Sequence, residues 1–154
     1  MIAELGIAPF QDRPAHALSG GQKKQVAIAD ILVMHPEIII LDEPVAALDP
    51  EHTEIVHRIV DDLTGQGITV LMSTHDIDYA LGWADEIVLM HEGKVLRKDA
   101  ALSVCMDREA LETAHLREPS VLRLFRNLTE KKILKEGRKP PKTMGQLESY
   151  LSGE

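Results

Sequence analysis

The 154-residue sequence contains one cysteine, Cys105, and only five aromatic residues. A single cysteine permits no disulfide within the chain and is typical of a reducing compartment. Five aromatic side chains leave little surface on which nucleic-acid bases could stack. The net charge is −8, from 17 basic and 25 acidic residues, which argues against a general binder of nucleic acid or of anionic membranes.

Long apolar runs are missing as well. The longest, such as residues 68–72, are far shorter than the ~18 residues that cross a bilayer, so we expect no transmembrane segment. The first basic residue is Arg13, and the N-terminus therefore lacks the charged start of a secretory signal. The length predicts a single domain, since domains contain roughly 150 residues.

The order of predicted elements is typical of an α/β fold. Residues 21–34 are nearly all apolar after their first turn and predict a helix buried on most sides. The run IIILDEP predicts a strand covered on both faces in a parallel sheet. Asp49 and Pro50 are typical of a helix start. The remaining predicted elements are a one-sided helix to Leu63, a second buried strand at 68–73, a short helix to Leu81, a strand at 86–90, and a hairpin through Glu92-Gly93 into 95–98.

The composition changes after Asp99. Helical patterns at 107–116 and 119–135 precede the linker GRKPPK, and Thr143 with Gln146 forms a capping-box signature for a last helix. We therefore predict two parts, residues 1–99 and an appended helical region at 100–154. Basic residues dominate the sequence from 123 to 142. We interpret them as a solvated face and linker, with a patch for anions or phospholipids as the alternative.

The pentapeptide Leu18-Ser19-Gly20-Gly21-Gln22 stands directly before the first predicted helix. Its serine hydroxyl and glycine N–H groups would converge at the positive end of a helix dipole, which favours a phosphate. The alternative is a serine cap followed by flexible glycines.

Two adjacent carboxylates, Asp42 and Glu43, end the predicted IIIL strand. Successive side chains of a strand point in different directions. One carboxylate can therefore hold Mg²⁺, often through water, while the other orients a nucleophilic water. His75 ends the next predicted strand, and a neighbouring parallel strand would bring it beside the carboxylates.

Four motifs, LSGGQ, IIILDEP, ALDP and STHD, occur in this order and together resemble the second half of an ATP-binding-cassette (ABC) nucleotide-binding domain. The resemblance implies a P-loop NTPase-like parallel sheet, of which the chain holds the C-terminal half. It also implies ATP and Mg²⁺ as cofactors. By this resemblance Asp42 supports Mg²⁺, Glu43 is the general base, Asp49 is the D-loop aspartate, and His75 contacts the γ-phosphate.

Cassettes of this family pair head to tail. The resemblance therefore implies that Ser19, Gly20, Gly21 and Gln22 contact ATP held by a second ABC subunit, in a homo- or heterodimer. By the same resemblance Asp42, Glu43 and His75 serve the chain's own site. It also implies integral membrane partners, a peripheral location at the cytoplasmic face of the membrane, and no nucleic-acid partner.

The tail is similar to the C-terminal region of cobalt and nickel energy-coupling-factor ATPase subunits, through residues 107–111, 114–116 and 119–124. This implies an ATPase subunit of an importer for cobalt or nickel. Two positions depart from the pattern: Gln25 stands where a basic residue is usual, and Val45 where threonine is common. Vitamin uptake and general import remain open as alternative tasks.

The motif GxxxxGK[ST], whose loop cradles phosphates, does not occur in this sequence. The glutamine loop of the family would also lie before Met1, so we interpret the chain as a truncated cassette. We expect it to bind Mg-ATP weakly and to hydrolyse little ATP alone. Two further alternatives are a non-catalytic half-cassette that supplies its signature motif to an intact partner, and a chromosome-maintenance ATPase.

Overall fold

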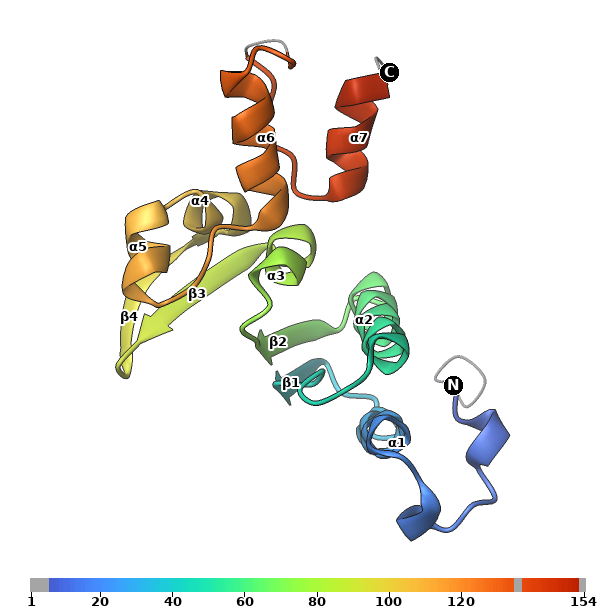
Figure 1. The fold of residues 1–154 in the computed structure, drawn as a ribbon. Coiled ribbons are helices and arrows are strands. Elements are labelled where there is room, and N and C mark those ends of the chain that lie inside the picture. Colours follow the sequence, from blue (N-terminus) through green and yellow to red (C-terminus); the bar gives the residue numbers. More distant parts are fainter. Residues whose placement is uncertain (1–5, 135–136, 153–154) are drawn as a thin grey trace. The chain divides into compact units, whose positions relative to one another are not determined.

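The computed structural model describes residues 6–134 and 137–152, which form two compact units, Met1–Thr74 and His75–Glu154. In the N-terminal unit, short turns of 3₁₀ helix at Ala8–Phe10 and Ala15–Ala17 precede α1 (Gly20–Leu32). The strand β1 (Ile38–Asp42), the helix α2 (Pro50–Gly65) and the strand β2 (Thr69–Ser73) follow (Figure 1). The predicted strand, helix and strand are therefore confirmed.

The two strands of this unit run parallel, from the pair Ile38–Thr69 to the pair Asp42–Ser73. The helix α2 connects them and begins as expected, with Asp49 as its N-cap and Pro50 in its first turn. Its buried side chains are spaced three and four residues apart, which makes it the one-sided helix that the sequence predicts. They are Val56, Ile59, Val60 and Leu63.

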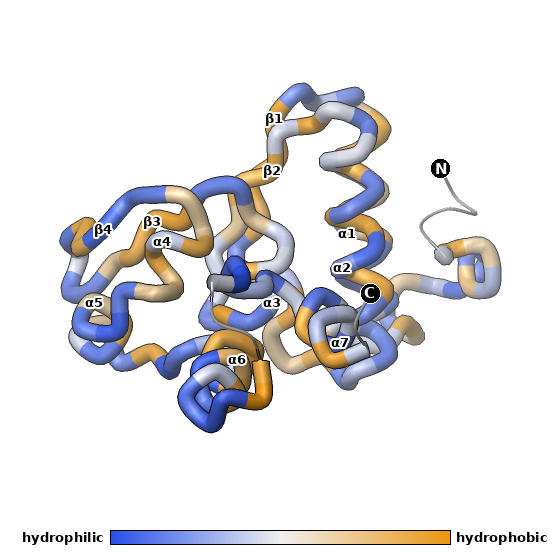
Figure 2. Tube along the Cα trace, turned by 90° about the horizontal axis from the view of Figure 1, so that it is seen from above, coloured by the Kyte–Doolittle hydropathy of each residue, from blue (hydrophilic) through white to orange (hydrophobic). Residues whose placement is uncertain are grey.

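Three burial predictions for this unit are wrong. The strand β2, expected to be buried, alternates between exposed and half-buried residues. The helix α1 buries one face, through Gly21, Gln25, Ile28 and Leu32. A hydrophilic stretch at 22–25 is followed along it by mostly hydrophobic residues (Figure 2). In β1 the buried residues alternate with Ile38 and Ile40, which are 62% and 70% exposed. The reason is that an apolar run shows that a strand can be covered on both faces, whereas the surrounding layers decide whether it is.

The C-terminal unit begins with α3 (Ile77–Trp83) and a hairpin of β3 (Glu86–His91) and β4 (Lys94–Ala100). Glu92 and Gly93 both have positive φ, 48° and 74°, which is the geometry of a tight two-residue hairpin turn. The predicted hairpin is confirmed. Short helices α4 (Ala101–Cys105) and α5 (Arg108–Thr113) follow, and both contact β3.

The helix α6 (Ser120–Glu130) is shorter than the predicted range of 119–135. The helix α7 (Met144–Ser152) begins directly after Thr143, where the last helix is predicted. The helix α5 ends early because His115 takes a left-handed backbone with φ of 58°, and α6 ends before Lys132 with φ of 57°. The predicted cap of α7 is present, since the Thr143 hydroxyl accepts the N–H of Gln146 at 3.3 Å. The apolar core of the unit includes Leu81, Cys105, Val121, Leu122, Leu134 and Leu147. Among the described residues, none of the helices is both long and apolar enough to cross a bilayer.

Candidate functional site

The glycine-rich pentapeptide forms the N-terminus of α1. Ser19 is its N-cap: the serine Oγ accepts the N–H of Gln22 at 3.2 Å, and the Gln22 Oε1 accepts the N–H of Ser19 at 3.0 Å. This reciprocal arrangement is a capping box. The serine cap is the alternative that the sequence offers, and the spacing S-x-x-Q signals the contact of Gln22 that completes it. The N–H groups of Gly20 and Gly21 lie in the first turn, where no carbonyl of the helix can accept them. They and the helix dipole favour an anion at this point.

Gly21 is the point where α1 meets α2. A methyl group at Gly21 would lie 2.1 Å from Cδ2 of His52, so the ring occupies the place of a side chain. The same ring is held by Asp49, whose two carboxylate oxygens lie 2.9 and 2.8 Å from Nδ1 of His52. Hydrogen bonds from the backbone N–H and the ring of His52 lower the pKa of Asp49. The ALDP segment therefore supports the glycine-rich turn through one imidazole.

The two predicted carboxylates stand at the carboxyl end of β1, as expected. Asp42 is exposed, and its Oδ1 accepts the hydroxyl hydrogen of Ser73 at 2.5 Å. Ser73 is the residue that pairs with Asp42 in the parallel register. Its Oγ and its carbonyl oxygen also accept the N–H of Glu43, at 3.0 and 3.1 Å. Sequence reasoning missed Ser73, although equal positions in adjacent parallel strands are the signal for such a pair.

Glu43 follows the strand with a left-handed backbone, φ of 43°. This conformation turns the chain sharply away from the strand at the residue after Asp42. The Nζ of Lys24, on α1, donates to the carbonyl oxygens of Glu43 and Ala46, each at 3.1 Å. Nothing in the sequence pattern indicated Lys24.

His75 is the first residue of the C-terminal unit, and its carbonyl oxygen accepts the N–H of Ile77 at 3.1 Å. The structure therefore joins the capped turn, Asp49, Asp42 and Glu43 within one unit, while the predicted place of His75 beside the carboxylates stays a prediction. In the described ranges no group of three or more His, Cys, Asp or Glu side chains is arranged to hold a metal ion. A single exposed carboxylate such as Asp42 still fits Mg²⁺, which usually keeps several waters and needs one or two carboxylates.

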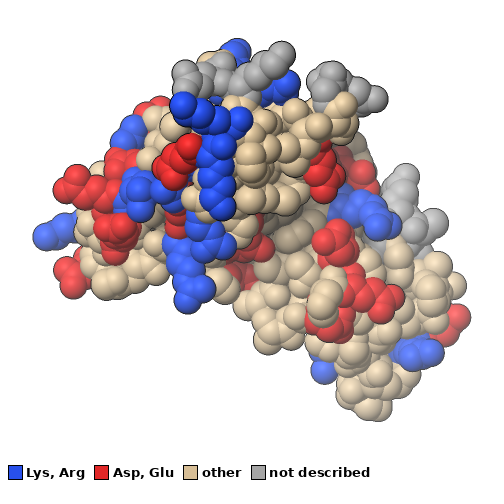
Figure 3. All heavy atoms as spheres, turned by 45° about the horizontal axis from the view of Figure 1, so that its top comes forward, with Lys and Arg blue, Asp and Glu red and all other residues tan. Residues whose placement is uncertain are grey.

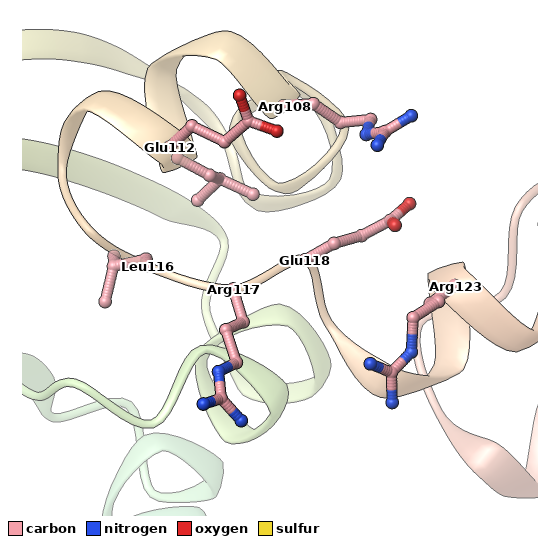
Figure 4. A pocket seen from close by; sticks show the side chains of 7 residues that line it. Arg108, Glu112, Leu116, Arg117, Glu118 and Arg123 are labelled. Atoms are coloured by element: carbon pink, nitrogen blue, oxygen red, sulfur yellow. The ribbon is translucent and has the colours of Figure 1, made fainter.

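A pocket of about 290 Å³ lies in the C-terminal unit between α5 and α6. Three arginines and two glutamates line it, and their charged ends point in different directions (Figure 4). One of these glutamates, Glu118, binds Arg126 at 2.6 Å. Charges of both signs also share the face shown in Figure 3, where basic side chains form a stripe with acidic side chains beside it. These features are those of a solvated, charged surface.

Comparison with known proteins identifies relatives of one kind. The family model described as ABC transporter matches residues 1–46. The energy-coupling factor transporter ATP-binding protein EcfA of Methanocaldococcus jannaschii is 43% identical over 84% of the chain and 47% of its own length. The cobalt import ATP-binding protein CbiO of Rhodobacter capsulatus is 38% identical over 99% of the chain and 54% of its own length.

A solved structure agrees with these relatives. It is that of cbiO1 from Clostridium perfringens, described as part of the ABC transporter complex cbiONQ. It matches with a TM-score of 0.61 and 39% identity, over 84% of this chain and 50% of the other. The chain thus spans about half the length of the curated relatives named above. The predicted fold class, the P-loop NTPase-like fold of ABC ATPases, is confirmed, and the chain belongs to the family of ABC transporter ATPases.

Proposed function

We propose that this chain is part of the ATP-binding and hydrolysing subunit of an energy-coupling-factor importer, with cobalt or nickel as the transported class. The observation that carries the proposal is the placement of two motifs in one unit. A capped Gly-Gly turn opens α1, and two carboxylates end a parallel strand. The metal class rests on relatives that are named for cobalt import and the cbiONQ complex. Import of another substrate is the alternative.

The residues divide the chemical work. Bound Mg²⁺ supplies positive charge against the phosphates, and Asp42 holds it, directly or through water, with the carboxylate oriented by Ser73. Glu43 accepts a proton from the attacking water as general base. We assign the γ-phosphate contact to His75 and a contact across the cassette dimer to Asp49.

The proposal includes partners that complete the site. A second ABC subunit, identical or different, holds the ATP that Ser19, Gly20, Gly21 and Gln22 contact. Integral membrane subunits carry the substrate and keep the assembly at the cytoplasmic face, and no nucleic acid takes part. We also propose that residues 1–99 belong to the cassette and 100–154 form its helical extension.

Mg-ATP titration tests this function. Because the chain has no GxxxxGK[ST] motif, we expect it to bind Mg-ATP weakly when alone. We also expect a complete cassette subunit of this family to bind more Mg-ATP with this chain than without it, and this difference is the added binding. The variant Ser19→Asp keeps an efficient helix cap but brings a negative charge to the phosphate. We expect it to reduce the added binding by about 10-fold or more while its thermal stability stays close to wild type.

Two outcomes separate the proposal from its alternatives. If Ser19→Asp binds as wild type does, the pentapeptide is only a cap and the proposal is wrong. Glu43→Gln separates ATP hydrolysis from ATP binding. A complete subunit with this change should lose hydrolysis by ~10²-fold or more and still bind ATP. If Glu43→Gln in this chain leaves the partner's turnover intact while Ser19→Asp abolishes it, the chain acts as a half-cassette. ATP turnover stimulated by DNA would instead indicate a chromosome-maintenance ATPase.

A further inference from the structure

Lys24 links two parts of the site that are distant in sequence. Its Nζ donates to the carbonyl oxygen of Glu43, 19 residues away, and to that of Ala46, 22 residues away. The side chain is partly buried, while that of the adjacent Lys23 is exposed. One ammonium group therefore ties the second turn of α1 to the loop that follows β1.

This loop needs such support because its backbone is strained. Glu43 and Ala47 are not glycines, yet their φ angles are 43° and 59°. Residues in this conformation persist where the surrounding structure fixes them, often at functional sites. The N–H of Glu43 is held by Ser73 of β2. Its carbonyl oxygen is held from the other side by Lys24 and by the N–H of Ala46, at 3.1 Å from each.

A second contact joins the same two segments. Gly21 lies one turn before Lys24 on α1, so both residues share one helix face. The ring of His52 packs against Gly21. His52 lies in the first turn of α2, the helix that follows the loop beginning at Glu43. Two attachment points set the orientation of a segment as well as its distance. The glycine-rich turn and the backbone of Glu43 are thereby held as one body.

We propose that Lys24 is a positioning residue, which holds α1 on the Glu43–Ala46 backbone and so fixes the place of the phosphate-binding turn that begins this helix. The proposal rests on the function proposed above, but its structural part does not need nucleotide. A loss of the ammonium should free the loop without removing any group that contacts ATP.

Hydrogen exchange of the full chain tests the structural part. In Lys24→Met the amides of Glu43 and Ala46 should exchange at least about 5-fold faster than in wild type, because their loop loses two hydrogen bonds. The matched control is Lys23→Met, which removes the neighbouring charge from the same helix and should leave these amides unchanged. Lys24→Arg should restore slow exchange, since a guanidinium can donate to two carbonyls. Equal exchange in Lys24→Met and Lys23→Met would overturn the proposal.

Turnover of a complete cassette subunit mixed with this chain tests the functional part. At saturating ATP, Lys24→Met should lower the chain-dependent rate by roughly 5-fold or more, because the turn that this chain presents to the ATP of the complete subunit loses its fixed place, and small misplacements are costly. Lys24→Arg should recover most of the rate, and Lys23→Met should keep it. Full activity of Lys24→Met would overturn the positioning role. If the wild-type chain changes nothing, the proposed function fails, and the exchange experiment still decides whether Lys24 holds the loop.

Discussion

Gly21 carries a steric requirement that its neighbour does not share. A Cβ on Gly21 would come within 2.1 Å of His52 Cδ2, whereas one on Gly20 would meet nothing within 4 Å. We expect Gly21→Ala to lower the free energy of unfolding by about 1–3 kcal/mol, the usual cost of overpacking. Gly20→Ala should leave it unchanged or slightly higher, because alanine favours helix. Urea denaturation of both variants measures the difference, and equal stabilities would show that His52 moves aside freely.

Cys105 has a buried thiol that we expect to react slowly in the folded chain. It is fully buried in the core of the C-terminal unit, and burial raises the pKa of its thiol to about 11. Because a thiol with a raised pKa stays protonated, the reactive thiolate is rare below that pH. At pH 8 we expect iodoacetamide to label the folded chain about 10²-fold more slowly than the urea-unfolded chain, as followed by mass spectrometry. Equal rates would mean that the thiol is accessible and ionised.

Whole elements of the C-terminal unit are joined by Arg97. This arginine of β4 contacts Asp107, the N-cap of α5, and binds Asp99 at 3.2 Å. The pKa of Asp107 is lowered by the N–H of Ala110 and by Arg97. That of Asp99 is lowered first by the Ser103 hydroxyl, then by the N–H of Ala100 and by Arg97. The three side chains connect a strand to the helices that follow it.

The lowered pKa values of Asp99 and Asp107 predict that the stability of this unit falls at acidic pH. A carboxyl whose pKa is lowered by folding contributes stability above its ordinary value of 3.8, and this contribution is lost as pH falls through the lowered value. We expect Arg97→Met to lower the Tm at pH 7 and to flatten the fall of Tm below about pH 4. Lys98→Met is the control, since the exposed Lys98–Glu86 pair at 3.5 Å contributes little. Thermal unfolding followed by circular dichroism decides, and identical curves for the two variants would refute the expectation.

At the scale of the whole molecule, the exposed apolar surface of the parallel strands stands out. Ile40 and its partner Leu71 are 70% and 58% exposed. Unpaired strand edges with apolar faces promote association between chains. We expect the purified chain to self-associate with rising concentration. The pair Ile40→Lys with Leu71→Glu should reduce this several-fold and change the free energy of unfolding by about 0.5 kcal/mol or less.

Light scattering and urea denaturation together measure both effects. The control is Ile39→Thr on the opposite face, where the side chain is 2% exposed; it should destabilise the chain without reducing association. Unchanged association in the charged pair would show that another surface is responsible.

Local interactions are what the sequence by itself determined. The caps of α2 and α7 and the turn at Glu92-Gly93 each depend on residues within about four positions of one another, so their signals survive in the chain order. The motif set by itself also predicts the ABC ATPase fold. The helix ends at His115 and Lys132 were less predictable, because left-handed backbones at ordinary residues have no clear sequence signal.

The tertiary structure alone decided how the motifs support one another. Ser73 orients Asp42 because the parallel register places them side by side, and Lys24 reaches Glu43 across 19 residues of chain. It also decided that β1 is covered on one face, since burial depends on which layers surround a strand. Contacts between distant segments depend on register and packing in three dimensions, and neither is written in the local pattern of side chains.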